Sequence, residues 1–269
     1  MKIFNKTVLI TGGASGIGRL MGKMALQKGA KCLVIWDIND NNLASAKEEF
    51  STLGTVYAYK VDISSPESID AACAQTGRDC GTVDILINCA GIITNNKRFF
   101  EQDDTDVQRT VNINTSGAML VTLRFIKDMV ARNDGHICNV TSSAGMLALP
   151  RMALYSASKW ASIGWSESIT LELEEMHSKV KVTTIAPYFI NTGMFDGIKS
   201  FFRIRKPEEV AAKTLRAIER DTRYRGIPFS SHFIRLMQGI FPYRLFNFVF
   251  GHVCGLYTVM NSFRGRANS

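Results

Sequence analysis

The chain has 269 residues, of which 46% are hydrophobic and 21% are charged, and its formal net charge is +8. This length and composition fit one large α/β domain and exclude a disordered chain, a collagen-like fibre and a disulfide-stapled mini-protein. The six cysteines form no C-x-x-C pair and no metal-ligand spacing, so we expect a reducing compartment. Residues 1–6 hold two lysines before the first apolar run, so no signal peptide is predicted.

Short apolar runs alternate with helix-like segments along the chain. The runs are too uniformly apolar for a sheet with one wet face, so they predict strands that helices bury on both sides. The alternation predicts a single α/β domain with a Rossmann-like, doubly wound parallel sheet. Asp40 or Asn41 is expected to cap the second helix, and Ser64 or Ser65 the third. The predicted strands are 7–11, 32–36, 56–61, 83–87, 136–140 and 180–185, and the predicted helices include 17–28, 42–53, 66–78 and 152–176.

A glycine-rich turn follows the first predicted strand. Gly12, Gly16 and Gly18 let the backbone turn tightly and approach a pyrophosphate, and the next helix N-terminus offers free N–H groups. Strand, turn and helix stand in the order that nucleotide binding requires, so we expect a dinucleotide site. At the end of the third strand, Asp62 either caps the next helix or meets an adenine. Small residues at 88–91 end the fourth strand, where a backbone can pass close to a cofactor.

Asp37 closes the second predicted strand, about 20 residues past the glycine turn. A carboxylate there can accept hydrogen bonds from an adenosine ribose and repels a 2′-phosphate, which favours NAD over NADP. Arg19 beside the turn can offset this preference. The alternative interpretation of Asp37 is an ordinary loop acid or helix cap near Asn39.

Tyr155 and Lys159 lie four positions apart, on one face of the predicted helix 152–176. A neighbouring ammonium and an oxidised nicotinamide would both lower the pKa of a phenol, which makes the phenol a usable base. Ser142 ends the fifth predicted strand, where ligands bind in parallel sheets, and its hydroxyl can hold a substrate oxygen. Ser143 competes for this role.

Together these motifs resemble the short-chain dehydrogenase/reductase family over residues 5 to about 230, and most of all its retinol dehydrogenases and the 17β-hydroxysteroid dehydrogenases similar to them. The family motifs are Thr11-Gly12-x-x-x-Gly16-x-Gly18, Asp37, Asp62, Asn88-x-Ala90-Gly91, Asn114, Ser142, Tyr155-x-x-x-Lys159, and Pro187 with Thr192. The subgroup motifs are residues 34–39, 187–195 and 260–266.

The resemblance implies that Tyr155 is the acid/base and that Ser142 positions the substrate oxygen. It implies that Lys159 binds the nicotinamide ribose and tunes Tyr155, and that Asn114 holds a proton-relay water. Asn114 is preferred to Asn112 because a glycine follows it three residues later. The implied cofactor-binding residues are Gly12, Ser15, Gly16, Ile17, Gly18, Asp37, Asp62, Ile63, Asn88, Ala90, Gly91, Tyr155, Lys159, Pro187 and Thr192, and no metal is implied.

Two positions depart from the family pattern. Cys89 replaces the usual second Asn of the Asn-Asn-Ala-Gly motif, and Tyr188 replaces the glycine that usually follows Pro187. The large ring of Tyr188 is expected to narrow or reshape the nicotinamide end of the site. The segment 193–205, with Met194, Phe195, Phe201 and Phe202, is expected to form an apolar substrate lid, and ordinary core packing is the alternative.

The resemblance implies an NAD-dependent oxidoreductase that interconverts an alcohol and a carbonyl on a lipophilic substrate such as a retinoid, a steroid or a long-chain alcohol. It also implies a homodimer or homotetramer formed through helices near 105–133 and 152–176. One alternative is an NADPH-dependent carbonyl reductase. Another is a nucleotide-binding protein of a membrane or lipid-droplet surface without turnover, against which the intact set Asn114, Ser142, Tyr155 and Lys159 argues.

The last acidic residue is Asp221, and the six arginines after it supply six of the eight net positive charges. Ten aromatic residues share this stretch, a composition that fits a membrane-surface segment or a lid packed on the core. The best membrane-span candidate, 245–257, is interrupted by Asn247 and His252 and is shorter than the ~20 residues required. No nucleic-acid recognition motif accompanies the arginines. We therefore expect a catalytic domain over 1–230, an extension over 231–269, and a cytoplasmic location with peripheral membrane or lipid-droplet contact.

Overall fold

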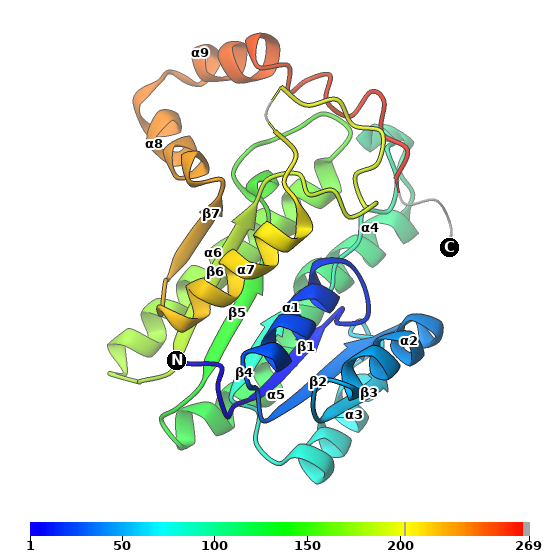
Figure 1. Ribbon diagram of the computed structural model, residues 1–269. Helices are drawn as coiled ribbons and strands as arrows, with labels where there is room; N and C mark the ends of the chain where they lie inside the picture. Colours follow the sequence, from blue (N-terminus) through cyan, green and yellow to red (C-terminus); the bar gives the residue numbers. More distant parts are fainter. Residues whose placement is uncertain (202, 266–269) are drawn as a thin grey trace.

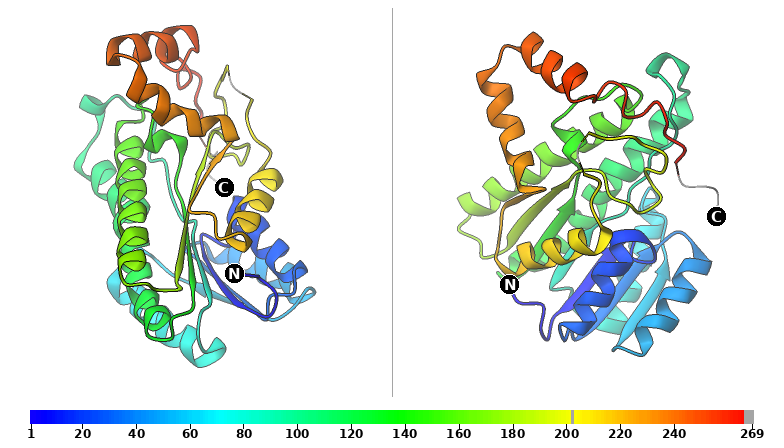
Figure 2. Two further views of the ribbon diagram at one scale, coloured as in Figure 1. Left: turned by 90° about the vertical axis from the view of Figure 1, so that its left-hand side faces the viewer. Right: turned by 45° about the horizontal axis from the view of Figure 1, so that its top comes forward.

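The computed structural model describes residues 1–201 and 203–265 of the chain. A seven-stranded sheet, parallel throughout, runs through the molecule in the order β3-β2-β1-β4-β5-β6-β7. Helices cover both of its faces (Figures 1 and 2), so the predicted doubly wound fold in a single domain is confirmed. The strands are β1 (Thr7–Thr11), β2 (Cys32–Asp37), β3 (Val56–Lys60), β4 (Ile85–Asn88), β5 (His136–Val140), β6 (Lys181–Pro187) and β7 (Tyr224–Ile227).

Two apolar layers hold the helices to the sheet. Val8 and Ile10 of β1 pack in the layer with α1 (Gly16–Gln27), α2 (Asp40–Ser51) and α7 (Pro207–Glu219). Leu9 points to the opposite layer, with α3 (Pro66–Cys80), α5 (Ala118–Ala131) and α6 (Ala153–Glu175). All five residues of β1 are buried because the side chains alternate between two covered faces, which is why the strands read as continuous apolar runs.

Some boundaries differ from the sequence prediction. The cap of α2 is Asn39, whose side chain accepts from the backbone N–H of Asn42 at 2.9 Å, so the prediction of Asp40 or Asn41 is wrong. Asp40 instead occupies the first turn, where a carboxylate interacts favourably with the helix dipole. Ser65 caps α3 through the N–H of Ser68, as one of the two predictions had it.

The helical region near 105–133 contains a π-turn. The turn spans Asn112–Gly117 and separates α4 (Asp104–Val111) from α5. It turns Asn114 into the interior, where the residue is 2% exposed, while Asn112 stays exposed. Single π-turns inside α-helices occur often at functional sites, and this one delivers the predicted site residue.

The C-terminal elements lie across the end of the sheet at which β5 and β6 finish (Figure 2). After β7 come η4 (Phe229–His232), α8 (Phe233–Ile240), α9 (Tyr243–Asn247) and η5 (Phe248–Val253). Ile234, Phe246 and Leu256 share one buried cluster with Leu147 and Tyr155, so this region packs on the rest of the domain. Within the described ranges, none of the helices is both long enough and apolar enough to cross a bilayer.

Candidate active site

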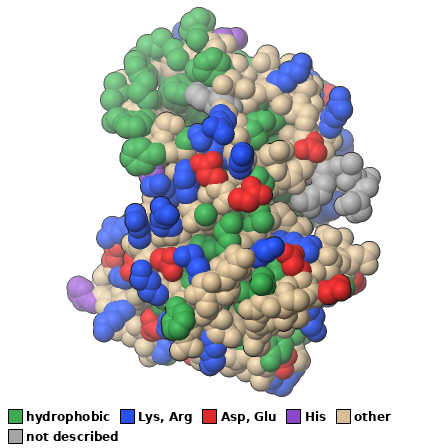
Figure 3. All heavy atoms as spheres, in the orientation of Figure 1, with side chains coloured by type: hydrophobic (Ala, Val, Ile, Leu, Met, Phe, Trp, Pro, Cys, Tyr) green, Lys and Arg blue, Asp and Glu red, His purple; other side chains and the backbone are tan. Residues whose placement is uncertain are grey.

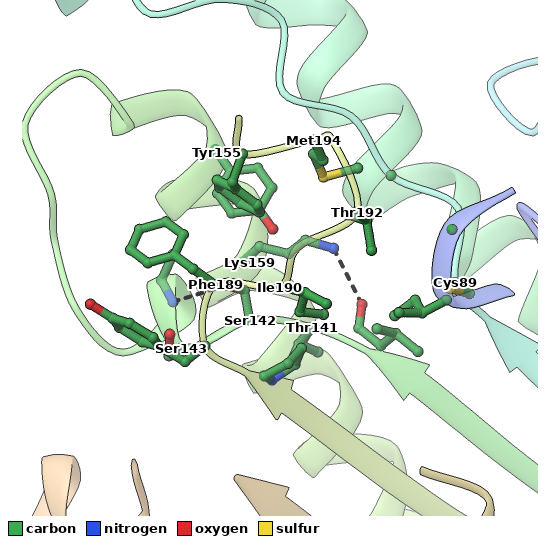
Figure 4. Close-up of a pocket in the computed structure, with 18 of the residues that line it drawn as sticks. Cys89, Thr141, Ser142, Ser143, Tyr155, Lys159, Phe189, Ile190, Thr192 and Met194 are labelled. Atoms are coloured by element: carbon green, nitrogen blue, oxygen red, sulfur yellow. Dashed lines mark hydrogen bonds between the residues drawn. The ribbon is translucent and has the colours of Figure 1, made fainter. Parts of the chain in front are cut away.

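One cavity opens at the carboxyl ends of β1, β4, β5 and β6, where parallel sheets bind ligands (Figure 4). The glycine turn and the segment 89–91 border one side of it, and apolar side chains border the other. The lining residues are Gly12, Ser15–Gly18, Cys89–Gly91, Val140–Ala144, Leu147, Leu149, Tyr155, Lys159, Pro187–Ile190, Thr192, Met194, Phe195 and Leu256.

The glycine turn leaves backbone exposed to this cavity. Gly12 has a φ of +66°, and a Cβ atom on it would come within 2.9 Å of the Ala90 Cα. A Cβ atom on Gly18 would come within 2.1 Å of the Gly12 carbonyl oxygen. The side chain of Ser15, at the N-cap of α1, makes no capping hydrogen bond. A helix N-terminus with free N–H groups and no obstructing side chains fits the pyrophosphate of a dinucleotide.

Asp37 lies beside this turn at the end of β2. Its carboxylate accepts hydrogen bonds from the N–H groups of Ala14 and Asn39, each at 3.1 Å. Asp37 therefore fixes the turn and also keeps a negative charge at the place where an adenosine ribose would bind. Arg19, which the sequence offered as an offsetting charge, pairs with Glu49 at 2.8 Å.

Four predicted cofactor residues, Asp37, Asp62, Ile63 and Asn88, lie outside the lining of the cavity. Asp62 accepts from the backbone and hydroxyl of Ser64, and Ile63 packs in the sheet core. Asn88 donates to Thr122 and Asn139, each at 2.8 Å, so its side chain joins β4 to its neighbours inside the core.

Three of the four predicted catalytic side chains, Ser142, Tyr155 and Lys159, face the same cavity (Figure 4) and are each less than 10% exposed. Ser142 Oγ accepts from the backbone N–H of Ala144 at 3.1 Å, and the Ser142 hydroxyl acts to lower the pKa of Tyr155, which favours Ser142 over Ser143 as the partner of Tyr155. Lys159 donates from Nζ to the Val140 carbonyl at 3.2 Å. Two hydroxyls and an ammonium thus converge where a substrate oxygen can bind.

The electrostatics of Tyr155 differ from the sequence prediction. Burial raises the pKa of Tyr155 to about 12, and the nearby Ser142 hydroxyl acts in the opposite direction. Lys159 does not lower it here, because the ammonium points to Val140 and lies 5.7 Å from the centre of the Tyr155 ring. Burial also lowers the pKa of Lys159 to about 8. Desolvation therefore dominates both groups.

Asn114 connects three elements behind the cavity. Its amide donates to the Ile92 carbonyl at 2.9 Å and to the Ser158 hydroxyl at 3.1 Å, and its oxygen accepts from the Ile92 N–H at 2.8 Å. The backbone carbonyl of Asn114 accepts from Ser162. The side chain thereby ties the loop after β4 to α6, one residue before Lys159.

Aromatic rings form the opposite wall. Phe195 packs edge-on against Tyr155 with 6.0 Å between ring centres, and Phe189 packs against Phe195 at 4.9 Å. Of the predicted lid residues, Met194 and Phe195 line the cavity, Phe201 is 75% exposed, and Phe202 lies outside the described residues. Tyr188 also lines the cavity, with its hydroxyl 3.1 Å from that of Ser200.

Sequence reasoning missed several wall residues, among them Leu147, Leu149 and Leu256. Leu256 follows η5 and reaches the cavity only because the C-terminal elements fold back over the sheet. The aromatic composition after Asp221 was the one sequence feature that pointed to the C-terminal region, and it fitted a substrate lid and a membrane-surface segment equally well.

The family model described as short chain dehydrogenase matches residues 6–201. The chain belongs to the short-chain dehydrogenase family. It is 31% identical over 273 residues to mouse (Mus musculus) epidermal retinol dehydrogenase 2, which covers 98% of this chain and 87% of that protein. It is 33% identical over 245 residues to estradiol 17-beta-dehydrogenase 11 of Pongo abelii, covering 90% and 81% of the two chains.

These relatives confirm the predicted subgroup and an oxidoreductase of the alcohol dehydrogenase type. A solved short chain dehydrogenase/reductase from Burkholderia phymatum in complex with NAD has the same fold, with a TM-score of 0.80 and 24% sequence identity. The superposition covers 89% of this chain and 95% of that one.

Proposed function

We propose that this protein is an NAD-dependent oxidoreductase that interconverts a lipophilic alcohol and its carbonyl compound. The observation that supports this most is that the Tyr155 and Ser142 side chains face one cavity, between the glycine turn and an apolar wall (Figure 4). A substrate oxygen that contacts both hydroxyls is held by Ser142 while Tyr155 takes or gives its proton. The apolar wall holds the rest of the substrate and excludes water from the transfer.

The cofactor would lie along the border of small residues. The α1 N-terminus would bind the pyrophosphate, Asp37 the adenosine ribose, Lys159 the nicotinamide ribose and Thr192 the carboxamide. Asp62 and Ile63, at the end of β3, are the proposed neighbours of the adenine. When bound, the nicotinamide exchanges a hydride with the alcohol carbon, and its oxidised form adds a positive charge that favours the phenolate.

NAD is proposed over NADP from the charges around the glycine turn. Asp37 places a carboxylate where a 2′-phosphate would lie, and Arg19 is engaged by Glu49 and by the hydroxyl of Ser45 at 3.1 Å. A phosphate there would meet a negative charge, and Arg19, which could offset that charge, is already paired. Fluorescence titration with both reduced cofactors tests this, and much tighter NADPH binding would favour the carbonyl reductase alternative.

The proton chemistry follows from the burial of Tyr155. A phenol whose pKa is raised to about 12 is protonated at neutral pH, which suits it to donate a proton when a carbonyl is reduced. For oxidation the phenolate must form, and the Ser142 hydroxyl and the positive charge of an oxidised nicotinamide both favour that form.

The direct test is a screen for NAD reduction across primary and secondary alcohols of increasing chain length and ring content. We expect NADH to form with lipophilic alcohols, including retinoid, steroid or long-chain members, and polar polyols to react more slowly. If cofactor binds but no alcohol or carbonyl is turned over, the alternative of a nucleotide-binding surface protein replaces this proposal.

The outer face of the C-terminal elements supports peripheral membrane contact. Apolar side chains gather over α8 and α9 (Figure 3), and this membrane face consists of Phe229, Phe233, Leu236, Ile240, Tyr243, Leu245, Phe248 and Val253, each at least 45% exposed. No acidic residue follows Asp221, whereas Arg225 and Arg244 do. Apolar rings beside arginines without acids suit an anionic lipid surface.

Vesicle co-sedimentation tests the membrane face. A chain cut at Asp221 would lose Phe246 and Leu256 from the core, so substitution is the better design. We expect Phe233→Glu with Ile240→Glu to release the protein from phosphatidylserine-containing vesicles, and Phe100→Glu, which is outside the membrane face, to leave binding unchanged. Equal binding of all three proteins would remove the proposal.

Self-association is proposed through α5 and α6, as the family resemblance implies. Leu123 on α5 and Leu171 on α6 are 47% and 62% exposed, which leaves apolar side chains for a second copy to cover. Light scattering after size exclusion should give a dimer or tetramer, and Leu171→Lys should shift it toward the monomer. A monomer for the wild type would contradict this.

A further inference from the structure

A second cavity of about 400 Å³ lies beside the active-site cavity, under the C-terminal elements. Its walls come from α9, η5, Ala148 and Trp160, the last on α6. Leu147 and Leu256 line both cavities, and both side chains are buried. The two cavities therefore adjoin at this pair of leucines.

The second cavity is apolar in character. Phe246 and Phe250 stack with 4.4 Å between ring centres. The amide of Gln238, one of its few polar groups, is engaged by the Met146 carbonyl at 2.7 Å. None of the lining residues carries a formal charge. Such a space stabilises an apolar group by removing it from water and offers little to a charged one.

The outer end of this cavity reaches the surface. Tyr243 and Trp160 both line it and are 78% and 49% exposed. Tyr243 also belongs to the membrane face. Mostly apolar side chains thus line the space from the outer surface, through the second cavity, to the leucine pair at the active-site cavity.

We propose that the second cavity binds the distal apolar end of an elongated alcohol whose hydroxyl lies at Tyr155 and Ser142. This inference rests on the proposed function and names its substrate class as flexible long-chain alcohols. Leu147 and Leu256 bound the junction with branched, buried side chains, so a single methylene chain would displace them less than a fused ring system would. The second cavity thereby selects substrates by length.

Chain-length dependence of kcat/KM provides the kinetic test. For straight-chain primary alcohols from butan-1-ol to hexadecan-1-ol, we expect kcat/KM to rise about two- to fourfold per buried methylene until both cavities are filled. Ala148→Trp and, independently, Asn247→Phe place a ring in the second cavity. Each should reduce kcat/KM for hexadecan-1-ol by about tenfold or more while butan-1-ol changes by less than about twofold.

The matched control is Ala74→Trp, which adds the same ring to an exposed alanine on α3. It should follow the wild type at every chain length. If both filling variants also follow the wild type at every chain length, the proposal is overturned.

A binding measurement separates this inference from the proposed function. A hexadecan-1-ol brominated near its far end should quench Trp160, and Trp160→Phe should remove that part of the quenching. Tyr155→Phe, in which the cavity wall is kept, should retain it. Quenching without any turnover would contradict the proposed function and support binding in the second cavity. Turnover without Trp160-dependent quenching would support the proposed function and contradict binding in the second cavity.

Discussion

The two sides of the active-site cavity are lined by different kinds of residue. The cofactor side, which is the part of the cavity proposed to bind the dinucleotide, consists of backbone and small residues around β1 and β4, such as Gly12, Gly18 and Ala90. The substrate side consists of large apolar side chains, such as Leu147, Phe195 and Leu256, brought together from distant parts of the chain.

This difference reflects what each side must bind. A pyrophosphate needs N–H groups at close range, so the cofactor side requires the absence of side chains at fixed positions. A lipophilic substrate needs only a filled apolar wall, which many combinations of side chains supply. Tyr155, Ser142 and Lys159 stand at the boundary, and substitutions on each side should separate binding of cofactor from chemistry.

The largest effect is expected at the boundary itself. Tyr155→Phe should lower kcat for alcohol oxidation by about 10³-fold, because the transferred proton loses its acceptor. Cofactor affinity should stay within about twofold, since the ring and its packing on Phe195 remain. Steady-state kinetics and NADH titration check this, with Tyr57→Phe as the control. A Tyr155→Phe rate within tenfold of the wild type would mean that another group moves the proton.

The next largest effect is expected from a substitution that disrupts the cofactor side alone. Gly18→Ala brings a Cβ atom within 2.1 Å of the Gly12 carbonyl, so the turn must shift, and NADH should bind about 100-fold more weakly. Gly77→Ala is the matched control, because no atom lies within 4 Å of its added Cβ. That helix-interior change should leave NADH binding unchanged and add about 0.5–1 kcal/mol of stability. Equal NADH affinity in both variants would contradict this account of the turn.

Lys159 tests the cost of holding a buried charge at the boundary. Burial lowers the pKa of Lys159 from 10.5 to about 8, which destabilises the folded protein at pH 7. Lys159→Met should therefore abolish turnover but raise the free energy of unfolding by about 2 kcal/mol at pH 7, after allowing for the lost hydrogen bond to Val140. The unfolded lysine binds its proton up to a higher pH than the folded one. The wild type therefore gains stability from pH 8 to above 10, and the advantage of the variant shrinks over that window.

Urea unfolding at pH 7 and pH 9.5 measures this difference. Lys127→Met, at an exposed position on α5, is the control and should show no such pH dependence. A stability difference for Lys159→Met that stays constant between the two pH values would refute the burial argument.

The smallest effect is expected on the preference of the cofactor side for NADH over NADPH. Asp37→Asn removes the charge and keeps one acceptor oxygen for the N–H of Ala14 or Asn39. The ratio of NADPH to NADH affinity should rise about tenfold, the amount expected from removing one nearby repulsive charge. Fluorescence titration measures both affinities, with Asp128→Asn on α5 as the control. An unchanged ratio would assign Asp37 to the turn alone.

The sequence predicted the strands and the glycine turn of the proposed cofactor side because their requirements are local. Six strands read as apolar runs since both faces of the sheet are covered, and the glycine spacing follows from the turn. β7 escaped prediction because it has four residues and includes Arg225 and Gly226. The spacing of Asn114 and Gly117 indicated the residue but not the π-turn, because the register of the turn is set by packing against α6.

The substrate side was predicted only in part, since its geometry depends on packing between distant segments. Met194 and Phe195 reach the cavity as expected, but Phe201 from the same segment is exposed. The sequence did not reveal the burial that raises the pKa of Tyr155, because desolvation depends on packing and not on the spacing of Tyr155 and Lys159. The second cavity depends on packing between residues 147–148 and residues 243–257, which are far apart in the sequence.

A crystal structure of the protein with NADH and a poorly reactive alcohol tests the central claim most directly. Both Tyr155 Oη and Ser142 Oγ should lie about 2.6–3.2 Å from the substrate oxygen, with the carbon facing the nicotinamide ring. A Tyr155 hydroxyl that points away from the bound substrate would contradict the proposed chemistry.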